Sequence, residues 1–264
     1  MNREAIETTF LKYTDQYDGT DPKIRLKIDH TYRVAELCQI IGESIQLSKR
    51  DLDLAWLCGM LHDYGRFEQL KRYDTFEDSK SIDHASFGAD LLFKENDIRF
   101  YNGGLTEEEL EVLETAIRSH SLYRIDESLS ERKKMFCNIL RDADKIDILE
   151  ANIKTKTEDI YNTTLEEVLH CEITKEVLEA FYEEHAVLRK LKKTPMDHLL
   201  AHISLTYELV YPKSLECMVK RGYLGKMLNR ESLNPNTQKV LKDAREYMKQ
   251  YLIRKGITDA EKYL

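Results

Sequence analysis

The scarcity of helix-breaking residues is the feature that most limits what this chain can fold into. Only four prolines occur among 264 residues, at positions 22, 195, 212 and 235. Proline removes a backbone donor and interrupts a helix, so long stretches of this chain are free to be helical. Apolar residues recur at helical spacing nearly everywhere, and the alternation of β-branched residues that indicates strands is almost absent. The sequence therefore predicts an all-α protein.

Local signals predict where several helices begin. The expected starts are Pro22, Ser48, about Asp83, Thr106 and about Glu131. Proline suits the first turn of a helix, and Ser48 and Thr106 are each followed three residues later by an acidic residue, which is the pattern of a capping box. Residues 64–82 are polar and aromatic, which indicates a loop or a short helix.

Composition excludes several classes of protein. The formal net charge of −8 argues against a surface that tracks nucleic acid, although a local basic pocket for a phosphorylated small molecule stays open. The first residues carry no secretory signal, and no run approaches the roughly 18 apolar residues of a membrane span. The five cysteines are scattered and never spaced CxxC, so a disulfide scaffold or a cysteine zinc site is not expected. We expect a cytoplasmic protein.

Histidines occupy faces that should be buried. His30, His84 and His120 each fall on the apolar side of a predicted helix, and His62-Asp63 ends another amphipathic segment. A buried polar group must be hydrogen-bonded or coordinated. One such histidine is most simply satisfied by a carbonyl, whereas four of them with inward aspartates are satisfied together by a metal centre. Imidazole with carboxylate suits Mn, Fe, Co, Ni or Zn better than Ca.

Periodicity alone does not decide which of two aspartates, Asp142 or Asp144, points inward as the second carboxylate. Asp144 lies four residues from both Leu140 and Ile148, whereas Asp142 falls on a stripe with Ile139. Either carboxylate could be a metal ligand. The other would then support the site by hydrogen bonding or cap a helix.

The order of these residues resembles a known family. His30, then His62-Asp63, then Asp144 is similar to the H…HD…D signature of the HD-domain superfamily of metal-dependent phosphohydrolases. Three stretches resemble its motifs: HTYRVA at 30–35, GMLHDYGR at 59–66 and RDADKID at 141–147. The resemblance covers roughly residues 22–150.

The resemblance implies a set of metal ligands. In this family the last ligand is the aspartate of an Ala-Asp-(Lys/Arg) run, which selects Asp144 over Asp142. A first divalent ion would be held by His30, His62, Asp63 and Asp144. His84 and His120 match the two extra histidines of the subset in which the HD aspartate bridges to a second ion. The implied fold is a compact helical bundle around one or two divalent transition-metal ions (Mn, Fe, Ni, Co or Zn).

Such a site would support hydrolysis by a metal-activated hydroxide. A divalent ion lowers the pKa of bound water from about 15.7 toward about 7. A second ion, bridged by Asp63, could hold that hydroxide and polarise a phosphoryl oxygen, and neutralising the charge of the phosphate is most of the catalytic task.

Basic residues near the motifs are candidates for binding the substrate. Arg66, three residues after Asp63, is a candidate catalytic contact to phosphate, and an ion pair with Glu68 or Asp78 is the alternative for its side chain. Lys145 and Arg124 are further candidates for substrate binding.

Together these features predict a metal-dependent phosphohydrolase, a phosphatase or phosphodiesterase, that acts on a phosphate ester or anhydride, with a nucleotide as the expected substrate. One alternative is an HD-type di-iron oxygenase of a small molecule, which uses the same six ligands. Another is a non-catalytic nucleotide sensor, against which the intact ligand set argues. The phosphorylated small molecule is the expected partner, with no membrane and no stable nucleic-acid partner.

Three parts are expected along the chain. They are an N-terminal helical lead-in over residues 1–21, an HD metal-binding core over 22–150, and a C-terminal helical extension over 151–264 packed on that core.

Overall fold

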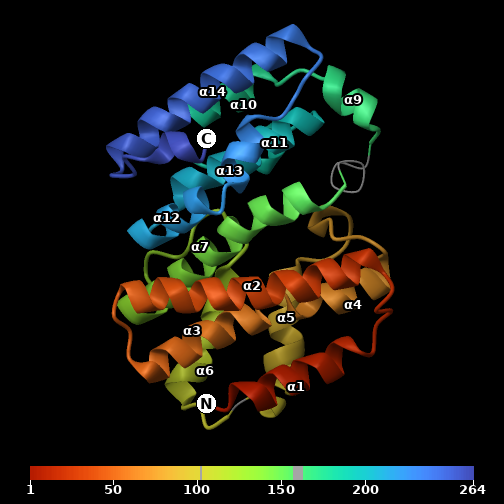
Figure 1. Ribbon diagram of the computed structural model, residues 1–264. Helices are drawn as coiled ribbons and strands as arrows, with labels where there is room; N and C mark the ends of the chain where they lie inside the picture. Colours follow the sequence, from red (N-terminus) through yellow and green to blue (C-terminus); the bar gives the residue numbers. More distant parts are fainter. Residues whose placement is uncertain (102, 157–162) are drawn as a thin grey trace. The chain divides into compact units, whose positions relative to one another are not determined.

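A computed structural model describes residues 1–101, 103–156 and 163–264, and every regular element in them is helical (Figure 1). The all-α prediction is confirmed. The chain forms two compact units, residues 1–144 and 145–264, and the boundary between them falls inside helix α7 (Glu131–Lys154).

The first unit contains six helices before α7 within its described residues: α1 (Arg3–Thr14), α2 (Pro22–Ser44), α3 (Lys49–Leu61), α4 (Tyr64–Tyr73), α5 (His84–Ala89) and α6 (Glu107–Ser119). Short helical turns η1 (Asp78–Lys80), η2 (Asp90–Lys94) and η3 (Asp97–Phe100) join them. The predicted starts are confirmed. Pro22 is the first residue of α2, and the Ser48 and Asp83 side chains cap α3 and α5. Thr106 and Glu109 form the expected capping box of α6.

Close contacts between glycines and neighbouring backbones bring the helices of this unit together. Helix α2 packs along α3, and α5 packs against both α4 and α6. A Cβ added at Gly59 of α3 would lie 2.5 Å from Ala35 Cα of α2. One added at Gly65 of α4 would lie 2.6 Å from Gly88 N of α5. Only glycine allows backbones to approach so closely.

The polar and aromatic stretch that follows α3 begins as a helix. The Tyr64 ring of α4 stacks on Tyr13 of α1 with centroids 3.9 Å apart, and Phe67 meets Phe10 edge-on at 5.9 Å. Aromatic packing of this kind stabilises a helix beyond the area that it buries. Helix α4 therefore owes its position to side chains more than 50 residues away in sequence.

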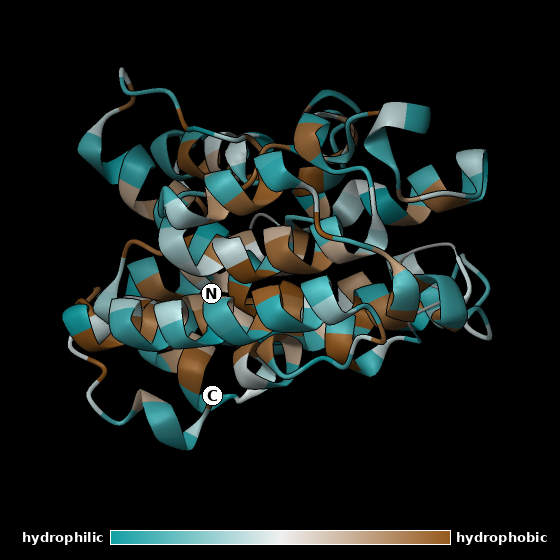
Figure 2. Cartoon of the chain, turned by 90° about the horizontal axis from the view of Figure 1, so that it is seen from above, coloured by the Kyte–Doolittle hydropathy of each residue, from teal (hydrophilic) through white to brown (hydrophobic). Residues whose placement is uncertain are grey.

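The second unit is also helical. Its helices are α9 (Leu165–His170), α10 (Lys175–Tyr182), α11 (Pro195–Ser204), α12 (Pro212–Lys220), α13 (Tyr223–Leu228) and α14 (Pro235–Arg254), with turns η4 (Arg189–Leu191), η5 (Leu205–Glu208) and η6 (Ala260–Lys262). Helix α11 packs against α10 and α13, and α14 packs against α13. Figure 2 shows apolar and polar residues on the same helices, as expected of amphipathic helices. None of the described helices is both long and apolar enough to cross a membrane.

Candidate metal centre

The His62-Asp63 pair forms the junction between α3 and α4. Helix α3 ends at Leu61 and α4 begins at Tyr64, so the two residues are the whole connection. Asp63 occupies the N-cap position of α4, but its carboxylate makes no capping bond there. Both side chains are buried. The carboxylate is thereby left for other partners in the interior.

Four further side chains reach the same region from different helices. His30 lies in the middle of α2, His84 is the first residue of α5, His120 is the C-cap of α6, and Asp144 lies on α7. The three histidines are buried, and the Asp144 side chain is 16 % exposed.

One group of atoms surrounds one oxygen of Asp63. His30 Nε2 lies 3.1 Å from His62 Nε2 and 3.2 Å from Asp144 Oδ1. Asp63 Oδ2 is 3.5 Å from the Nε2 atoms of both histidines. Four of the predicted ligands therefore converge at this position.

A second group surrounds the other oxygen. His84 Nε2 and His120 Nε2 lie 3.0 Å apart. Asp63 Oδ1 is 3.4 Å from the first and 3.7 Å from the second. The two carboxylate oxygens of Asp63 thus face two different pairs of imidazoles. The structure brings together all six side chains that the sequence analysis assigned to metal binding.

The hydrogen bonds of the Nδ1 atoms determine whether the Nε2 atoms, which face Asp63, carry a proton or a lone pair. Nδ1 lies 2.7 Å from an acceptor in three rings: from Gly59 O for His62, from Ile117 O for His120 and from Asp78 Oδ2 for His84. Because a carbonyl or carboxylate oxygen can only accept, Nδ1 carries the ring proton in each case. In a neutral ring Nε2 then presents a lone pair to the centre.

The ionisation of these groups agrees with that assignment. Burial and the neighbouring His84 and His62 lower the pKa of His120 to about 3. Burial and the charge of Arg66 also lower the pKa of His84. Both rings are therefore neutral near pH 7. Burial alone would raise the pKa of Asp63, but Lys27, His62 and Arg66 hold it well below its usual range. Burial would also raise the pKa of Asp144, but its contact with His30 lowers that pKa below its usual range. Both carboxyl groups are therefore ionised near pH 7.

These observations make a divalent cation a good fit to the six side chains. Two neutral Nε2 atoms at 3.0 Å have no proton between them, so their lone pairs repel unless a cation lies near both. A metal–nitrogen bond of about 2.1 Å places adjacent ligands about 3 Å apart in a right-angled arrangement. Among the described residues, two sets of three have ligand atoms within 4.8 Å of one another: His30, His62 and Asp144, and His62, Asp63 and His120.

Lys27 is a member of the centre that the sequence analysis missed. Its Nζ lies 2.6 Å from Asp63 Oδ2, and its side chain is only 17 % exposed. The signal was present in the sequence, because Lys27 lies three residues before His30 and so shares its face of α2. A lysine on a helix is ordinarily solvent-exposed, and only the position of Asp63 makes this one distinctive.

Arg66 forms the ion pair that was the alternative to a phosphate contact. Its Nη1 lies 2.9 Å from Asp78 Oδ1 and also donates to the Phe76 carbonyl at 2.7 Å. Its Nε is 3.6 Å from Asp63 Oδ1. Glu68, the other partner considered, pairs with Arg72 instead. Arg66 therefore lies beside the bridging carboxylate, and a contact between Arg66 and substrate stays a prediction.

The structure also describes the remaining candidates, Arg124, Lys145 and Asp142. Arg124 is exposed and stacks over the Tyr123 ring at 4.8 Å. Lys145 follows Asp144 on α7 and is half-buried. Asp142 is fully buried, yet it belongs to neither of the two sets of potential ligands found among the described residues.

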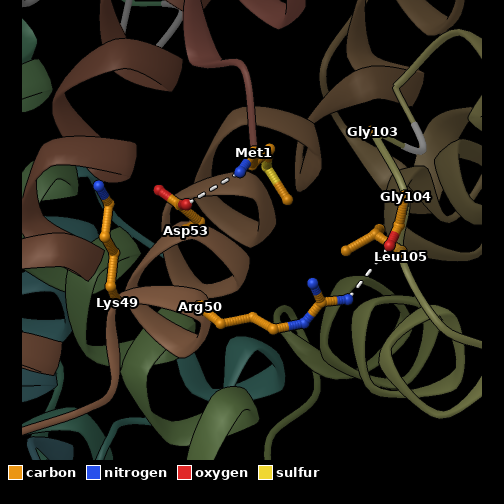
Figure 3. A pocket seen from close by; sticks show the side chains of 7 residues that line it. All are labelled: Met1, Lys49, Arg50, Asp53, Gly103, Gly104 and Leu105. Carbon is orange, nitrogen blue, oxygen red and sulfur yellow. Dashed lines mark hydrogen bonds and ion pairs between the residues drawn. The ribbon is translucent and has the colours of Figure 1, made fainter.

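A separate cavity of about 290 Å³ lies at the start of α3 (Figure 3). It is lined by Met1, Lys49, Arg50, Asp53, Gly103, Gly104 and Leu105. Its Asp53 carboxylate pairs with the Met1 amino group at 3.3 Å, and Arg50 Nη2 donates to the Gly104 carbonyl at 3.1 Å. The cavity shares no residue with the histidine cluster.

Comparison with known proteins gives one match. Residues 28–152 match the family model of the HD domain. The search of curated proteins and the search of solved structures gave no significant match. All six converging side chains fall inside the matched range. Residues 28–152 of this chain are an HD domain.

Proposed function

We propose that this chain is a metal-dependent phosphohydrolase that cleaves a phosphate ester or anhydride of a nucleotide. The observation that carries this function is the position of Asp63, whose two oxygens face two separate pairs of histidine nitrogens. A carboxylate so placed can bridge two divalent ions.

The chain's own residues would each have a stated task. His30, His62, Asp63 and Asp144 would hold one ion, and His84 with His120 and the other oxygen of Asp63 would hold the second. Bound there, a divalent ion supplies a nucleophilic water of lowered pKa and neutralises phosphoryl charge. The Nδ1 bonds of His62, His84 and His120 keep those rings in the orientation needed for ligation.

Positive side chains next to the centre would bind the phosphate. Lys27 is the nearest, because its ammonium already contacts Asp63. When metal ions take over the charge of that carboxylate, the ammonium becomes available to a phosphate oxygen. Arg66 would keep Asp63 ionised from the side of its other oxygen, and Lys145 would contribute from the next position of α7 after Asp144.

Arg124 and Tyr123 favour a nucleotide over a smaller phosphate ester. Tyr123 is 42 % exposed and lies three residues after His120, and the Arg124 guanidinium lies over one face of its ring. Three residues span at most about 10 Å. An exposed aromatic ring at that distance from a metal ligand suits stacking against a base, while the guanidinium suits a phosphate.

The direct test is the Asp63→Ala variant. We expect it to lose bound metal and hydrolytic activity together, measured by elemental analysis of the purified protein and by a panel of nucleotides and simple phosphoesters. Asp90→Ala is the matched control, since that carboxylate pairs with Arg118 and Lys94 instead. An Asp63→Ala protein that retained full metal content and hydrolysed the same substrates would overturn the proposal.

The same preparation separates hydrolysis from the oxygenase alternative. Loaded with iron and given substrate, a hydrolase releases phosphate or a nucleoside phosphate and consumes no oxygen. Consumption of dioxygen with oxidation of a small molecule, and no phosphate release from any member of the panel, would replace the proposed function with the oxygenase.

A further inference from the structure

Helix α6 ends next to His120, one of the converging histidines, and its last carbonyl groups lie in the interior. Its last residue is Ser119, and His120 is the C-cap. The last carbonyls of a helix have no donor within the helix and need partners from elsewhere. Beyond them the chain turns through Leu122 and Tyr123, whose side chains are 48 % and 42 % exposed.

One buried arginine on another helix donates to several of these carbonyls, and the Leu122 N–H also donates to that of Ser119 at 3.3 Å. Arg141 lies on α7, one turn before Asp144, and is only 7 % exposed. Its Nη1 donates to the carbonyls of Ser119 at 3.0 Å and of His120 at 3.2 Å, and also to that of Leu122. Its Nη2 donates to the Tyr123 carbonyl at 3.3 Å. One guanidinium thus binds the backbone of the whole turn.

Only arginine can make this arrangement. The guanidinium is planar and presents five donors in a rigid fork, whereas the lysine ammonium is a compact charge on a flexible stem. Its positive charge also lies at the C-terminal end of α6, where the helix dipole favours a cation. The contacts are to the main chain, so they restrain the path of the turn whatever side chains it carries.

We infer that Arg141 is a positioning residue for the second metal ion: it fixes the turn after α6 so that His120 stays against Asp63. The inference rests on the proposed metal-dependent function. It also links the two halves of the centre, because the helix that restrains His120 is the one that carries Asp144. His30 lies within α2 and His62 directly follows α3, so the backbone of each is held by a helix other than α6.

The test is a metal titration of Arg141→Lys and Arg141→Met in the full chain. Metal-free protein is titrated with Mn²⁺ by calorimetry. We expect the weaker of the two binding steps to lose about 10–100-fold in affinity, the usual effect of removing a group that orients a ligand. The tighter step should change by less than about threefold on the same scale. Arg132→Met is the matched control, because Arg132 lies on the same helix and pairs with Asp51. It should leave both steps unchanged.

Several outcomes would overturn the inference. They are an unchanged second step, an equal loss in both steps, a wild-type protein that binds only one ion, or failure of both variants to fold, since Arg141 would then serve the fold rather than His120. Failure of the proposed function is a different result. A wild-type protein that binds two ions, loses the second in both variants and hydrolyses no phosphate compound would leave the role of Arg141 standing and remove the hydrolase.

Discussion

The carboxylate of Asp63 is buried among four imidazole rings, and its negative charge has to be balanced in every state of the protein. Lys27 does this most directly, with its Nζ 2.6 Å from Asp63 Oδ2. An uncompensated charge in the interior is costly, because neither water nor a partner solvates it.

Lys27→Met should therefore destabilise the metal-free protein more than the metal-loaded one. We expect a loss of about 1–3 kcal/mol without metal, the cost of leaving a buried polar group unpaired, and a smaller loss with saturating Mn²⁺, because the metal then balances Asp63. Denaturant unfolding with and without Mn²⁺ measures both. Lys23→Met on the same helix is the control, since its partner Asp74 is exposed. Equal losses with and without metal would contradict this account.

Protonation of His120 should oppose folding in the metal-free protein. Its pKa in the folded state is about 3, below the value of about 6.5 of a free imidazole. The burial of neutral His120 therefore does not lower the free energy of unfolding above about pH 6.5. Below that pH the unfolded chain binds a proton that the folded chain does not, so the free energy of unfolding falls as the pH falls toward the folded pKa.

His120→Gln should flatten this pH dependence. Each histidine that is protonated only on unfolding contributes a slope of up to about 1.4 kcal/mol per pH unit. We expect the variant's free energy of unfolding to fall less steeply than wild type between about pH 6 and pH 4. The exposed His170 provides the control substitution, His170→Gln. Identical slopes in wild type and His120→Gln would show that His120 is not buried in its neutral form.

For individual residues, the sequence predicted the six converging side chains but not the charged residues that contact them, Lys27 and Asp78. Inward histidines stand out because a polar residue on an apolar stripe is unusual. Lys27 and Asp78 did not stand out, because a lysine or an aspartate near a helix end is ordinary. Their importance arises from contacts with Asp63 and His84, and such pairings follow from the fold rather than from local spacing.

Helices α4 and α5 meet at two glycines, and this contact determines where His84 lies. A Cβ at Gly65 would come within 2.7 Å of the His84 carbonyl as well as 2.6 Å of Gly88 N. Both obstacles are backbone atoms, so they cannot turn aside as a flexible side chain would. Any side chain at Gly65 must push α5 away from α4.

Gly65→Ala should therefore weaken the metal centre from a distance. We expect a loss of about 1–3 kcal/mol in stability from overpacking, and weaker binding of one metal ion as His84 moves from Asp63. Thermal unfolding and metal content per chain measure the two effects. Gly19→Ala is the control, because nothing lies within 4 Å of a Cβ at that position. A Gly65→Ala protein with normal stability and metal content would show that the helices can separate without moving His84.

Helix starts were predictable because caps are local. Ser48, Asp83 and Thr106 each bond to a backbone group only three residues away. The helix after His62-Asp63 was less certain from sequence, because the rings that stabilise α4 stack on Tyr13 and Phe10 of α1. Contacts between segments this far apart cannot be read from periodicity.

The whole molecule divides its tasks unevenly between its two compact units. The six converging side chains all belong to residues 30–144, inside the first unit and inside the HD domain. A ligand that binds only the folded state stabilises it, by about 2.7 kcal/mol at 100 times its dissociation constant.

Metal binding should therefore protect the first unit most. We expect Mn²⁺ to slow amide hydrogen exchange chiefly in α2, α3, α5, α6 and the turn of α7 around Asp144, with smaller changes in α10–α14. Exchange measured on the full chain with a chelator and then with Mn²⁺ gives the comparison. Greater protection in α10–α14 than in the first unit would contradict the placement of the metal centre.

The ion pairs around Asp63 have a consequence for how the protein should be assayed. Lys27 and Arg66 bring two positive charges to this cluster, and Asp63, Asp78 and Asp144 bring three negative ones. The metal-free cluster is thus slightly anionic and has little attraction for a phosphate. Each divalent ion bound there would add two positive charges, so metal loading would reverse the sign of the local charge and let the same side chains attract an anion. A screen for phosphate ligands in a buffer that contains a chelator would therefore detect no binding.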